Sequence, residues 1–151
     1  MLLTGTFVRT VDDKLRVAIP KNLKAALEEA GEGQLYMTPG TDGSLAVYPE
    51  QALSSLAERL AAASPAGQDV RAFSRMFYAR AQAVEIDGQG RIRIPPDLAT
   101  LAAIEKDAVL VGVQDHLELW DRGRWESYLA EKQPRFDEIA EAAFRGGLGN
   151  S

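Results

Sequence analysis

The stretch DDKLRVAIP, residues 12–20, returns as DGQGRIRIP at residues 87–95, an offset of 75 positions. At this offset, five residues in and just after the two stretches are identical. The identical pairs are Asp12 and Asp87, Arg16 and Arg91, Ile19 and Ile94, Pro20 and Pro95, and Leu23 and Leu98. A repeat at constant spacing indicates an internal duplication, so the two halves of the chain are predicted to fold alike.

The first copy predicts a strand, a tight turn, a second strand, a helix, a hairpin and a second helix. The strands alternate apolar and polar residues, and the helices carry apolar residues at helical spacing. Asp42-Gly43 is the clearest turn signal of the chain, and Gly31 is the predicted stop of the first helix. The predicted elements are strands at 5–12 and 16–20, a helix at 21–31, hairpin strands at 34–39 and 45–49, and a helix at 50–64.

The second copy predicts the same order of elements. Its strands are expected at 82–87, 91–95, 107–113 and 116–121, with a helix at 96–104 and a helical tail from Arg124. The stretch DVRAFSRMFYARA, residues 69–81, has no counterpart in the first copy and is predicted to be helical or mixed.

The chain is predicted to divide into four segments, of which the two repeats share one core. Each half is short, and several of its strands are too short to stand alone, so one pseudo-twofold domain is the economical prediction. The tail lies outside the duplicated unit and is expected to be dispensable for folding. The predicted segments are a first repeat at 1–64, a connector at 65–83, a second repeat at 84–133 and a helical or flexible tail at 134–151.

Composition restricts the functional classes. The 151 residues are 46% hydrophobic and 26% charged and include no cysteine, which excludes disulfides and thiolate metal sites. No apolar run reaches the length of a membrane span, and a cytoplasmic protein is expected. The formal net charge of -5 is unusual for a DNA-binding protein. Residues 1–27 nevertheless hold five basic side chains against two aspartates, so a local basic surface is possible.

The repeated Asp-x-x-x-Arg pattern leaves two uses for its arginine. An aspartate that opens a tight turn accepts hydrogen bonds from backbone N–H groups one to three residues on, so Asp12 and Asp87 are predicted to structure the turns. The arginine, Arg16 or Arg91, either closes back on that carboxylate or projects outward to a phosphate or a guanine edge. From the residues alone, the internal ion pair is at least as probable as the outward contact.

The doubled pattern, with LAVYPEQAL after the first copy and LELWDRGRWESYL after the second, resembles the MraZ family of the AbrB-like, swapped-hairpin superfamily. The resemblance implies an α+β fold with a mostly β core: a pseudo-twofold swapped-hairpin β-barrel with peripheral helices. It also implies a cytoplasmic, nucleoid-associated transcriptional regulator. Such a regulator would assemble as a homo-oligomeric ring and bind repeated promoter elements of the division and cell-wall gene cluster. The family normally has glycine before the motif arginine, as at Gly90, whereas the first copy has Leu15.

With this resemblance, DNA contact by the turns becomes the favoured role of the arginines. No nucleophile and base stand in a recognisable pattern, so no enzyme, cofactor, metal, membrane contact or small-molecule substrate is predicted. The alternative is an oligomeric interaction module of the same fold with weak or lost DNA binding, suggested by Leu15 and the net charge. The predicted double-stranded DNA contacts are Lys14, Arg16, Arg91, Arg93 and Arg9, and the predicted turn-structuring residues are Asp12, Asp87 and Gly90.

Two further features carry weaker predictions. Arg71, Arg75 and Arg80 lie among aromatic residues and could form a second basic surface or a subunit contact, although a solvated helix face is the default. His116, the only histidine, is predicted to be a solvated residue of a hairpin turn.

Overall fold

The largest feature of the molecule is an antiparallel sheet of six strands whose order reflects the duplication. The computed structural model describes residues 2–30, 34–63 and 67–149; the predicted helix stop at Gly31 and the junction at 64–66 lie outside them. Across the sheet the strands are β1 (Thr6–Thr10), β7 (Asp107–Val113), β8 (His116–Asp121), β4 (Leu45–Pro49), β3 (Leu35–Pro39) and β5 (Gln82–Val84). Exchanging the two copies maps this order onto itself, so the predicted pseudo-twofold relation is confirmed.

The strands of the two copies are interleaved. β1 of the first copy pairs with β7 of the second, with Val8 opposite Val109, and β5 of the second pairs with β3 of the first, with Tyr36 opposite Ala83. The two copies meet at the centre of the sheet, where β4 pairs with β8. The first strand of each copy, β1 or β5, therefore pairs with the second hairpin of the other copy, β7–β8 or β3–β4. This is the swapped-hairpin arrangement.

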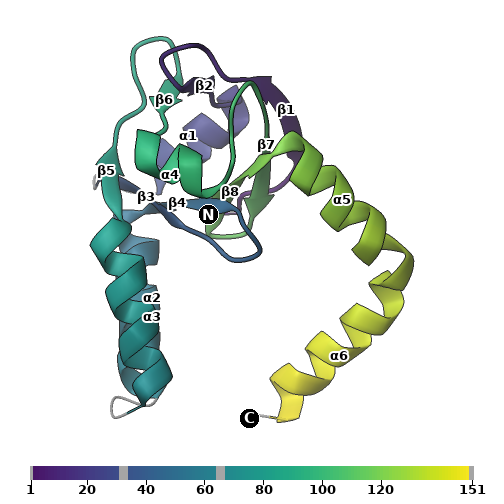
Figure 1. The fold of residues 1–151 in the computed structure, drawn as a ribbon. Helices are drawn as coiled ribbons and strands as arrows, with labels where there is room; N and C mark the ends of the chain where they lie inside the picture. The colour runs from purple at the N-terminus through teal and green to yellow at the C-terminus, as the bar shows by residue number, and fades with distance from the viewer. Residues whose placement is uncertain (1, 31–33, 64–66, 150–151) are drawn as a thin grey trace.

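The remaining two strands form a separate ribbon over one face of the sheet (Figure 1). β2 (Arg16–Ala18) and β6 (Arg91–Arg93) pair only with each other, and their central residues are buried. The expected swapped-hairpin β-barrel is not closed among the described strands, because β1 and β5 stay at the two edges of the sheet. The tight turn after each edge strand folds the next three residues over the sheet instead of extending its hydrogen-bonded ladder.

One hydrophobic core fills the space between the ribbon and the sheet. Leu45, Leu110, Leu117 and Leu119 of the sheet are all 0% exposed and belong to the same cluster as the buried residues of the ribbon. Both copies contribute buried residues to this one cluster, so neither repeat encloses a core of its own.

Two short helices close the ends of the core. α1 (Lys21–Glu29) and α4 (Pro96–Leu101) each begin directly after the motif proline, whose fixed φ suits the residue before a first helical turn. Leu23 and Leu98, which are equivalent in the two copies, are 2% and 0% exposed. The repeated motif therefore ends by directing a helix onto the shared core.

The other helices form two arms on the side of the sheet opposite the ribbon (Figure 1). The first arm contains α2 (Glu50–Ala63) and α3 (Gln68–Arg80), so residues 69–81 are mainly helical. The second contains α5 (Arg122–Lys132), the 3-10 turn η1 (Gln133–Arg135) and α6 (Phe136–Gly149). None of these helices is long and apolar enough to cross a membrane, and this holds for every helix in the described ranges.

Candidate nucleic-acid interface

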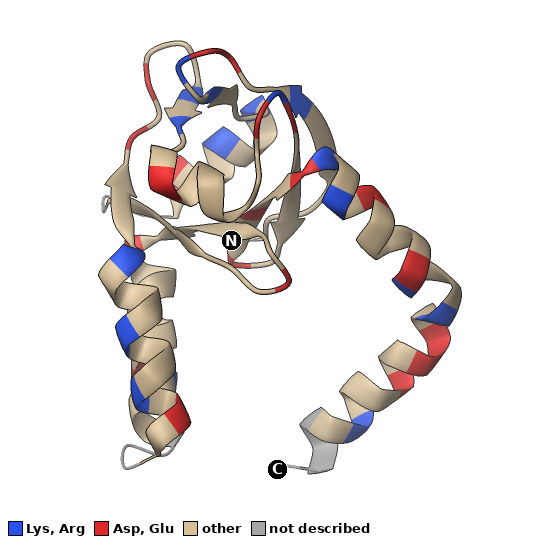
Figure 2. Ribbon diagram, in the orientation of Figure 1, with Lys and Arg blue, Asp and Glu red and all other residues tan. Residues whose placement is uncertain are grey.

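The outer face of the ribbon carries three arginines. β2 and β6 pair in the register that places Arg16 opposite Arg93 and Ala18 opposite Arg91. Because side chains alternate along a strand and the central residue of each strand is buried, these four residues share the solvent-facing side. Figure 2 shows the resulting basic segments on both ribbon strands, at the end of the molecule away from the two arms.

Each ribbon strand is preceded by the same aspartate-closed turn. In the first turn, the carbonyl oxygen of Asp12 accepts a hydrogen bond from the N–H of Leu15 at 3.0 Å. The Oδ1 atom of Asp12 accepts from the N–H groups of Lys14 at 3.0 Å and Arg16 at 2.8 Å. The second turn repeats these three bonds around Asp87, at 3.0, 2.9 and 2.9 Å. The structure thus gives both aspartates the geometry of turn-structuring residues.

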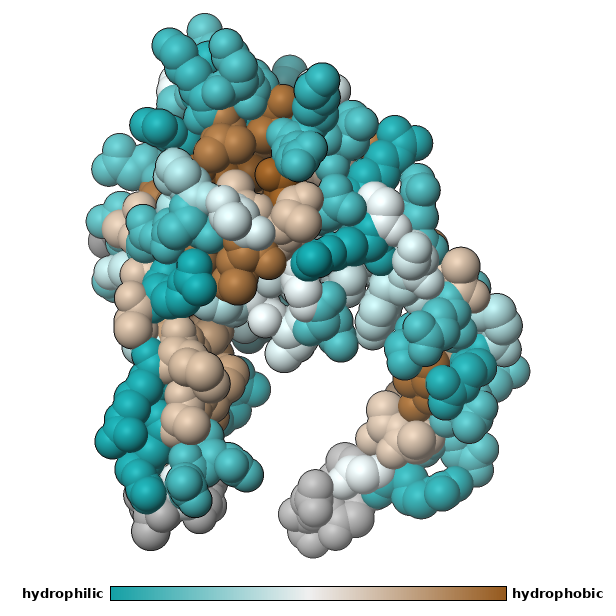
Figure 3. All heavy atoms as spheres, in the orientation of Figure 1, coloured by the Kyte–Doolittle hydropathy of each residue, from teal (hydrophilic) through white to brown (hydrophobic). Residues whose placement is uncertain are grey.

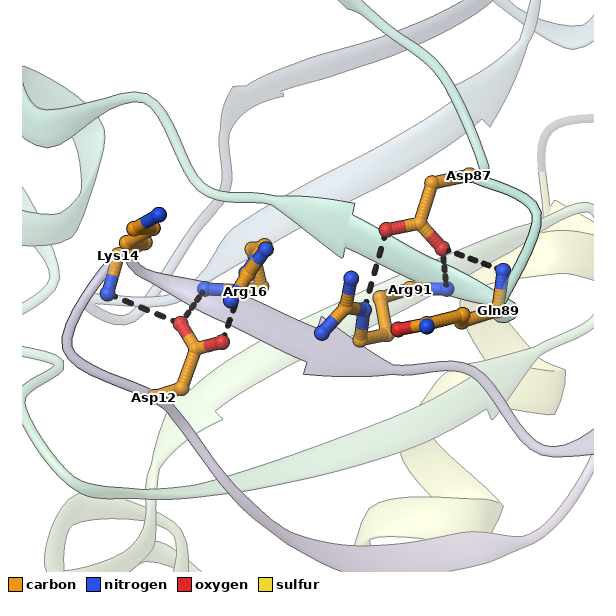
Figure 4. A network of polar contacts seen from close by, with 6 residues as sticks. All are labelled: Asp12, Lys14, Arg16, Asp87, Gln89 and Arg91. Atoms are coloured by element: carbon orange, nitrogen blue, oxygen red, sulfur yellow. Dashed lines mark hydrogen bonds and ion pairs between the residues drawn. The ribbon is translucent and has the colours of Figure 1, made fainter.

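The second carboxylate oxygen of each aspartate binds the motif arginine (Figure 4). The Nε atom of Arg16 donates to Oδ2 of Asp12 at 2.7 Å, and that of Arg91 donates to Oδ2 of Asp87 at 3.0 Å. The arginine side chains remain 30% and 27% exposed. Their terminal nitrogens make no hydrogen bond to any described residue, so each guanidinium can be held by its aspartate and still present donors to an external anion.

The turn hydrogen bonds also keep the aspartates ionised. The N–H of Arg16 lowers the pKa of Asp12 below its ordinary value and outweighs burial, which acts in the opposite direction; the guanidinium of Arg16 lowers it further. The N–H of Arg91 is likewise the main cause of the lowered pKa of Asp87. A lowered pKa contributes stability that is present above the unfolded value and lost as the pH falls through the folded value, so these turns are unchanged across the neutral range.

Leu15 and Gly90 occupy the same left-handed backbone position in the two turns. Their φ angles are +61° and +78°. This region is strained for a residue with a Cβ atom, and leucine adopts it at a cost of about 1 kcal/mol. Leu15 compensates by packing its partly buried side chain against the hydrophobic core. The turn shape expected from a glycine is therefore kept in both copies, and the ribbon is not distorted by the substitution.

Substitutions at Leu15 and Gly90 test the balance between backbone strain and side-chain burial in these turns. We expect Gly90→Ala to lower the free energy of unfolding by about 1 kcal/mol through backbone strain alone, because a Cβ atom at Gly90 meets nothing within 4 Å. We expect Leu15→Gly to change it by less than about 1 kcal/mol, because strain relief and the loss of burial offset each other. Urea denaturation at fixed protein concentration measures both values. A clear gain in stability for Leu15→Gly would contradict the packing contribution.

The two ends of the ribbon differ in charge. Because the strands are antiparallel, Arg93 of the second copy lies beside Arg16 of the first. One end therefore holds Lys14, Arg16 and Arg93, whereas the other end holds Arg91 alone, since Ala18 stands where symmetry would place a further arginine. Two aspartates accompany the first end and one accompanies the second. The first end keeps the larger positive charge.

Among the predicted contacts, Arg9 lies on neither the ribbon strands nor the turns that precede them. It lies on β1, where its guanidinium carbon stands 5.7 Å from the centre of the Phe7 ring and its Nη1 donates to the carbonyl of Val8 at 2.9 Å. The sequence also did not reveal that Arg16 and Arg93 are neighbours. The available signal in the sequence was the alternation of outer and buried positions in RVA (16–18) and RIR (91–93). This alternation places Arg16 and Arg93 on the outer face once the two motif strands are paired.

His116 is not the solvated turn residue that the sequence predicted. It is the first residue of β8, its side chain is only 17% exposed, and its ring stacks on that of Tyr48 with centroids 4.7 Å apart. Burial would lower its pKa, but hydrogen bonding to the carboxylates of Glu118 and Asp115 outweighs burial and raises the pKa above the ordinary value. The hairpin tip brings Asp115, Glu118 and Tyr48 close to His116, and the turn propensities of the sequence do not predict these contacts.

The raised pKa of His116 predicts a pH-dependent contribution to stability. A raised folded pKa contributes stability that is complete below the unfolded value of about 6.5 and is lost as the pH rises through the folded value. We expect His116→Gln to lose more unfolding free energy, relative to the natural chain, at about pH 5.5 than at about pH 9. Thermal or urea unfolding of both proteins at the two pH values measures this difference. Equal differences at both values would show that His116 does not gain a proton on folding.

Comparison with known proteins places the chain in a family. A family model described as "MraZ protein, putative antitoxin-like" matches twice, over residues 2–76 and 77–146. "Transcriptional regulator MraZ" of Limosilactobacillus reuteri (strain DSM 20016) is 41% identical over 140 residues, which cover 93% of this chain and 96% of that protein. Proteins of the same name from Heliobacterium modesticaldum (38% over 140 residues; 93% and 95% covered) and Thermomicrobium roseum (41% over 124 residues; 82% and 84% covered) are similar. The chain therefore belongs to the MraZ family.

Proposed function

We propose that this protein is a sequence-specific, DNA-binding transcriptional regulator that reads duplex DNA with the β2–β6 ribbon. The observation that carries the proposal is the arginine-bearing outer face of the ribbon. A two-stranded ribbon fits the major groove of B-DNA, where arginine recognises guanine edges and phosphates. The relatives named as transcriptional regulators support the same function.

The Arg16–Arg93 pair is the preferred anion position within this surface. Like charges directly opposite each other destabilise a pair of strands, and Asp12 offsets only one of the two guanidinium groups. A phosphate between them removes the repulsion and satisfies the terminal nitrogens, so the pair gains more from DNA than a lone arginine does. The surface is small and the net charge of the chain is -5, so a single copy is expected to bind weakly.

The proposed regulator acts in the cytoplasm, associated with the nucleoid, as a homo-oligomeric ring without catalytic activity. Several weak ribbons, linked in one assembly, bind repeated promoter elements of the division and cell-wall gene cluster with an affinity that none has alone. Exposed apolar side chains on both arms, among them Met76 (66% exposed) and Phe144 (73% exposed), support self-association.

An electrophoretic mobility shift assay at two salt concentrations tests DNA recognition. The probe is duplex DNA from upstream of the protein's own gene, and the control is a scrambled duplex of the same composition. We expect a specific complex whose affinity falls steeply with salt, by a slope of about 0.9 for each phosphate contact. Arg122→Ala serves as a matched control, because Arg122 is an exposed arginine on α5 that belongs to neither ribbon strand and pairs with Glu126.

The same assay separates a second candidate function, an oligomeric interaction module without DNA binding. The net charge of -5 and the two apolar arms favour this alternative. A chain that assembles but gives no shift at low salt would establish it in place of the regulator.

A further inference from the structure

A hollow of about 770 Å³, which we call the α3 hollow, lies between helix α3 and the face of the sheet that is opposite the ribbon. Its wall is one side of α3, and its floor consists of side chains of β4 and β8. Figure 3 shows apolar residues on the side of the first arm that faces the second arm, with hydrophilic residues on its outer side. Hollows of about 300 to 1,000 Å³ with mainly apolar walls are typical sites for small molecules. The α3 hollow therefore has the size and the lining of a ligand site.

The floor of the α3 hollow has room at its centre because the sequence places a small residue there. On β4, Leu45 and Val47 belong to the hydrophobic core, so Ala46 between them faces the opposite side of the sheet. The next residue on that side, Tyr48, meets the ring of Phe77 from α3, with centroids 6.4 Å apart. α3 is therefore held above the sheet at Tyr48, and the space beside Ala46 forms part of the hollow.

The second copy fills the equivalent position with aromatic side chains. The ring of Trp120 lies 5.3 Å from that of Trp125 and 5.0 Å from that of Tyr128. At an offset of 72 positions, the first copy has smaller side chains in place of these three: Tyr48, Leu53 and Leu56. The hollow that remains beside Trp120 is lined mainly by charged side chains. The apolar ligand site is therefore a feature of the first copy.

The wall of the α3 hollow changes from apolar to basic along the helix. All four residues of one helix face line it: Phe73, Met76, Phe77 and Arg80. The Nη2 atom of Arg80 stands 3.6 Å from Oδ2 of Asp97, and the two side chains are 39% and 53% exposed, so this ion pair is weak. Nη2 also donates to the backbone carbonyl of Asp97 at 3.3 Å, whereas Nε and Nη1 of Arg80 make no hydrogen bond to any described residue. Arg80 can therefore bind an anion at this end of the hollow.

The opposite end of the hollow carries a negative charge whose partners lie within the chain. Glu118 accepts a hydrogen bond from Nε1 of Trp120 at 3.0 Å and lies 3.8 Å from Nε2 of His116. Burial would raise the pKa of Glu118, but hydrogen bonding to His116 and Trp120 outweighs burial and lowers it. Glu118 lies on β8, whereas Arg80 just precedes β5, three strand positions across the sheet or about 14 Å. An anionic group is therefore attracted to one end of the hollow and repelled from the other.

We propose that the α3 hollow binds a small monocarboxylate with an apolar body. The carboxylate pairs with Arg80, and the apolar body lies beside Ala46, between Tyr48 and the apolar face of α3. The polarity of the hollow selects this class, because Arg80 repels a cation and a neutral molecule lacks the anion that the guanidinium donors fit. The site lies on the face of the sheet opposite the ribbon, so it can be occupied whether or not the ribbon binds DNA.

Matched probes test this site in the full-length protein. Octanoate and 2-naphthoate are each compared with the alcohol of the same body, and octylamine supplies the opposite charge. Saturation-transfer NMR, titrated with each probe, measures the dissociation constants. We expect at least one carboxylate to bind about tenfold or more tightly than its alcohol, and octylamine to bind more weakly than octan-1-ol. The carboxylate that binds more tightly shows whether the natural ligand has a flexible chain or a flat aromatic body.

Three variants, each verified as folded by circular dichroism, assign the binding to the α3 hollow. Arg80→Gln should remove the tenfold preference for the carboxylate and leave the affinity for the alcohol unchanged. Met76→Glu, at a side chain that is 66% exposed, should weaken the carboxylate and strengthen octylamine. Arg75→Gln is the matched control, because Arg75 is an exposed arginine of the same helix that does not line the hollow.

Three results would overturn the proposed site. They are no saturable binding of either carboxylate at millimolar concentration, equal affinity for carboxylate and alcohol, and an effect of Arg75→Gln as large as that of Arg80→Gln. None of these measurements contains DNA, so a failure here leaves the proposed regulator to be decided by the mobility shift assay.

Discussion

Arg16→Ala and Arg93→Ala are each expected to weaken specific DNA binding by about tenfold or more, and Arg91→Ala by less. Arg16 and Arg93 lie opposite each other and, with Lys14, form the more basic end of the ribbon. Arg91 lies opposite an alanine, and its aspartate offsets its charge. Removal of either member of the Arg16–Arg93 pair would eliminate half of the proposed two-guanidinium anion site in every copy of the chain.

Titration of the promoter duplex with each variant, at matched ionic strength, measures this ranking. The slope of affinity against salt should fall by about 0.9 for each phosphate that a bound subunit no longer neutralises. Arg122→Ala should leave affinity and slope unchanged. If Arg91→Ala proves the most damaging of the three, then DNA approaches from the second turn and the local charge does not set the binding mode.

Division of the chain between its two copies is expected to abolish folding of the separate halves as monomers. In the first half, β1 is separated from β7 and β4 from β8, and in the second half, β5 is separated from β3. What remains in each half is one hairpin with an unpaired edge strand, and an isolated hairpin is marginal in water. The hydrophobic cluster is also divided, because both copies contribute its fully buried residues.

Fragments 1–66 and 67–151 provide the measurement. Each fragment alone should give the circular dichroism spectrum of a largely unfolded chain at low micromolar concentration, and an equimolar mixture should recover the strand and helix signal of the natural protein. Ultracentrifugation distinguishes this complex from self-paired fragments. A fragment that is monomeric and cooperatively folded would show that the interleaved pairing is not required for stability.

The local features of this protein were predicted from its sequence because their causes are local. The aspartate turn is closed by hydrogen bonds that span four residues, so Asp12 and Asp87 could be assigned from spacing alone. The Asp42-Gly43 turn shows the positive φ angles, +58° and +81°, that its residue types favour. The repeat at constant offset indicated two like halves, and alternation indicated which side of each strand faces the core.

Tertiary structure decided everything that depends on which strand lies beside which. Spacing along the chain does not encode the pairing of β1 with β7, or the position of Arg93 next to Arg16 instead of within its own copy's turn. It also did not show that the sheet stays open or that His116 is held between two carboxylates and Tyr48. These contacts form between residues far apart in sequence, where the burial of a shared core, and not the preference of any local segment, selects the partner.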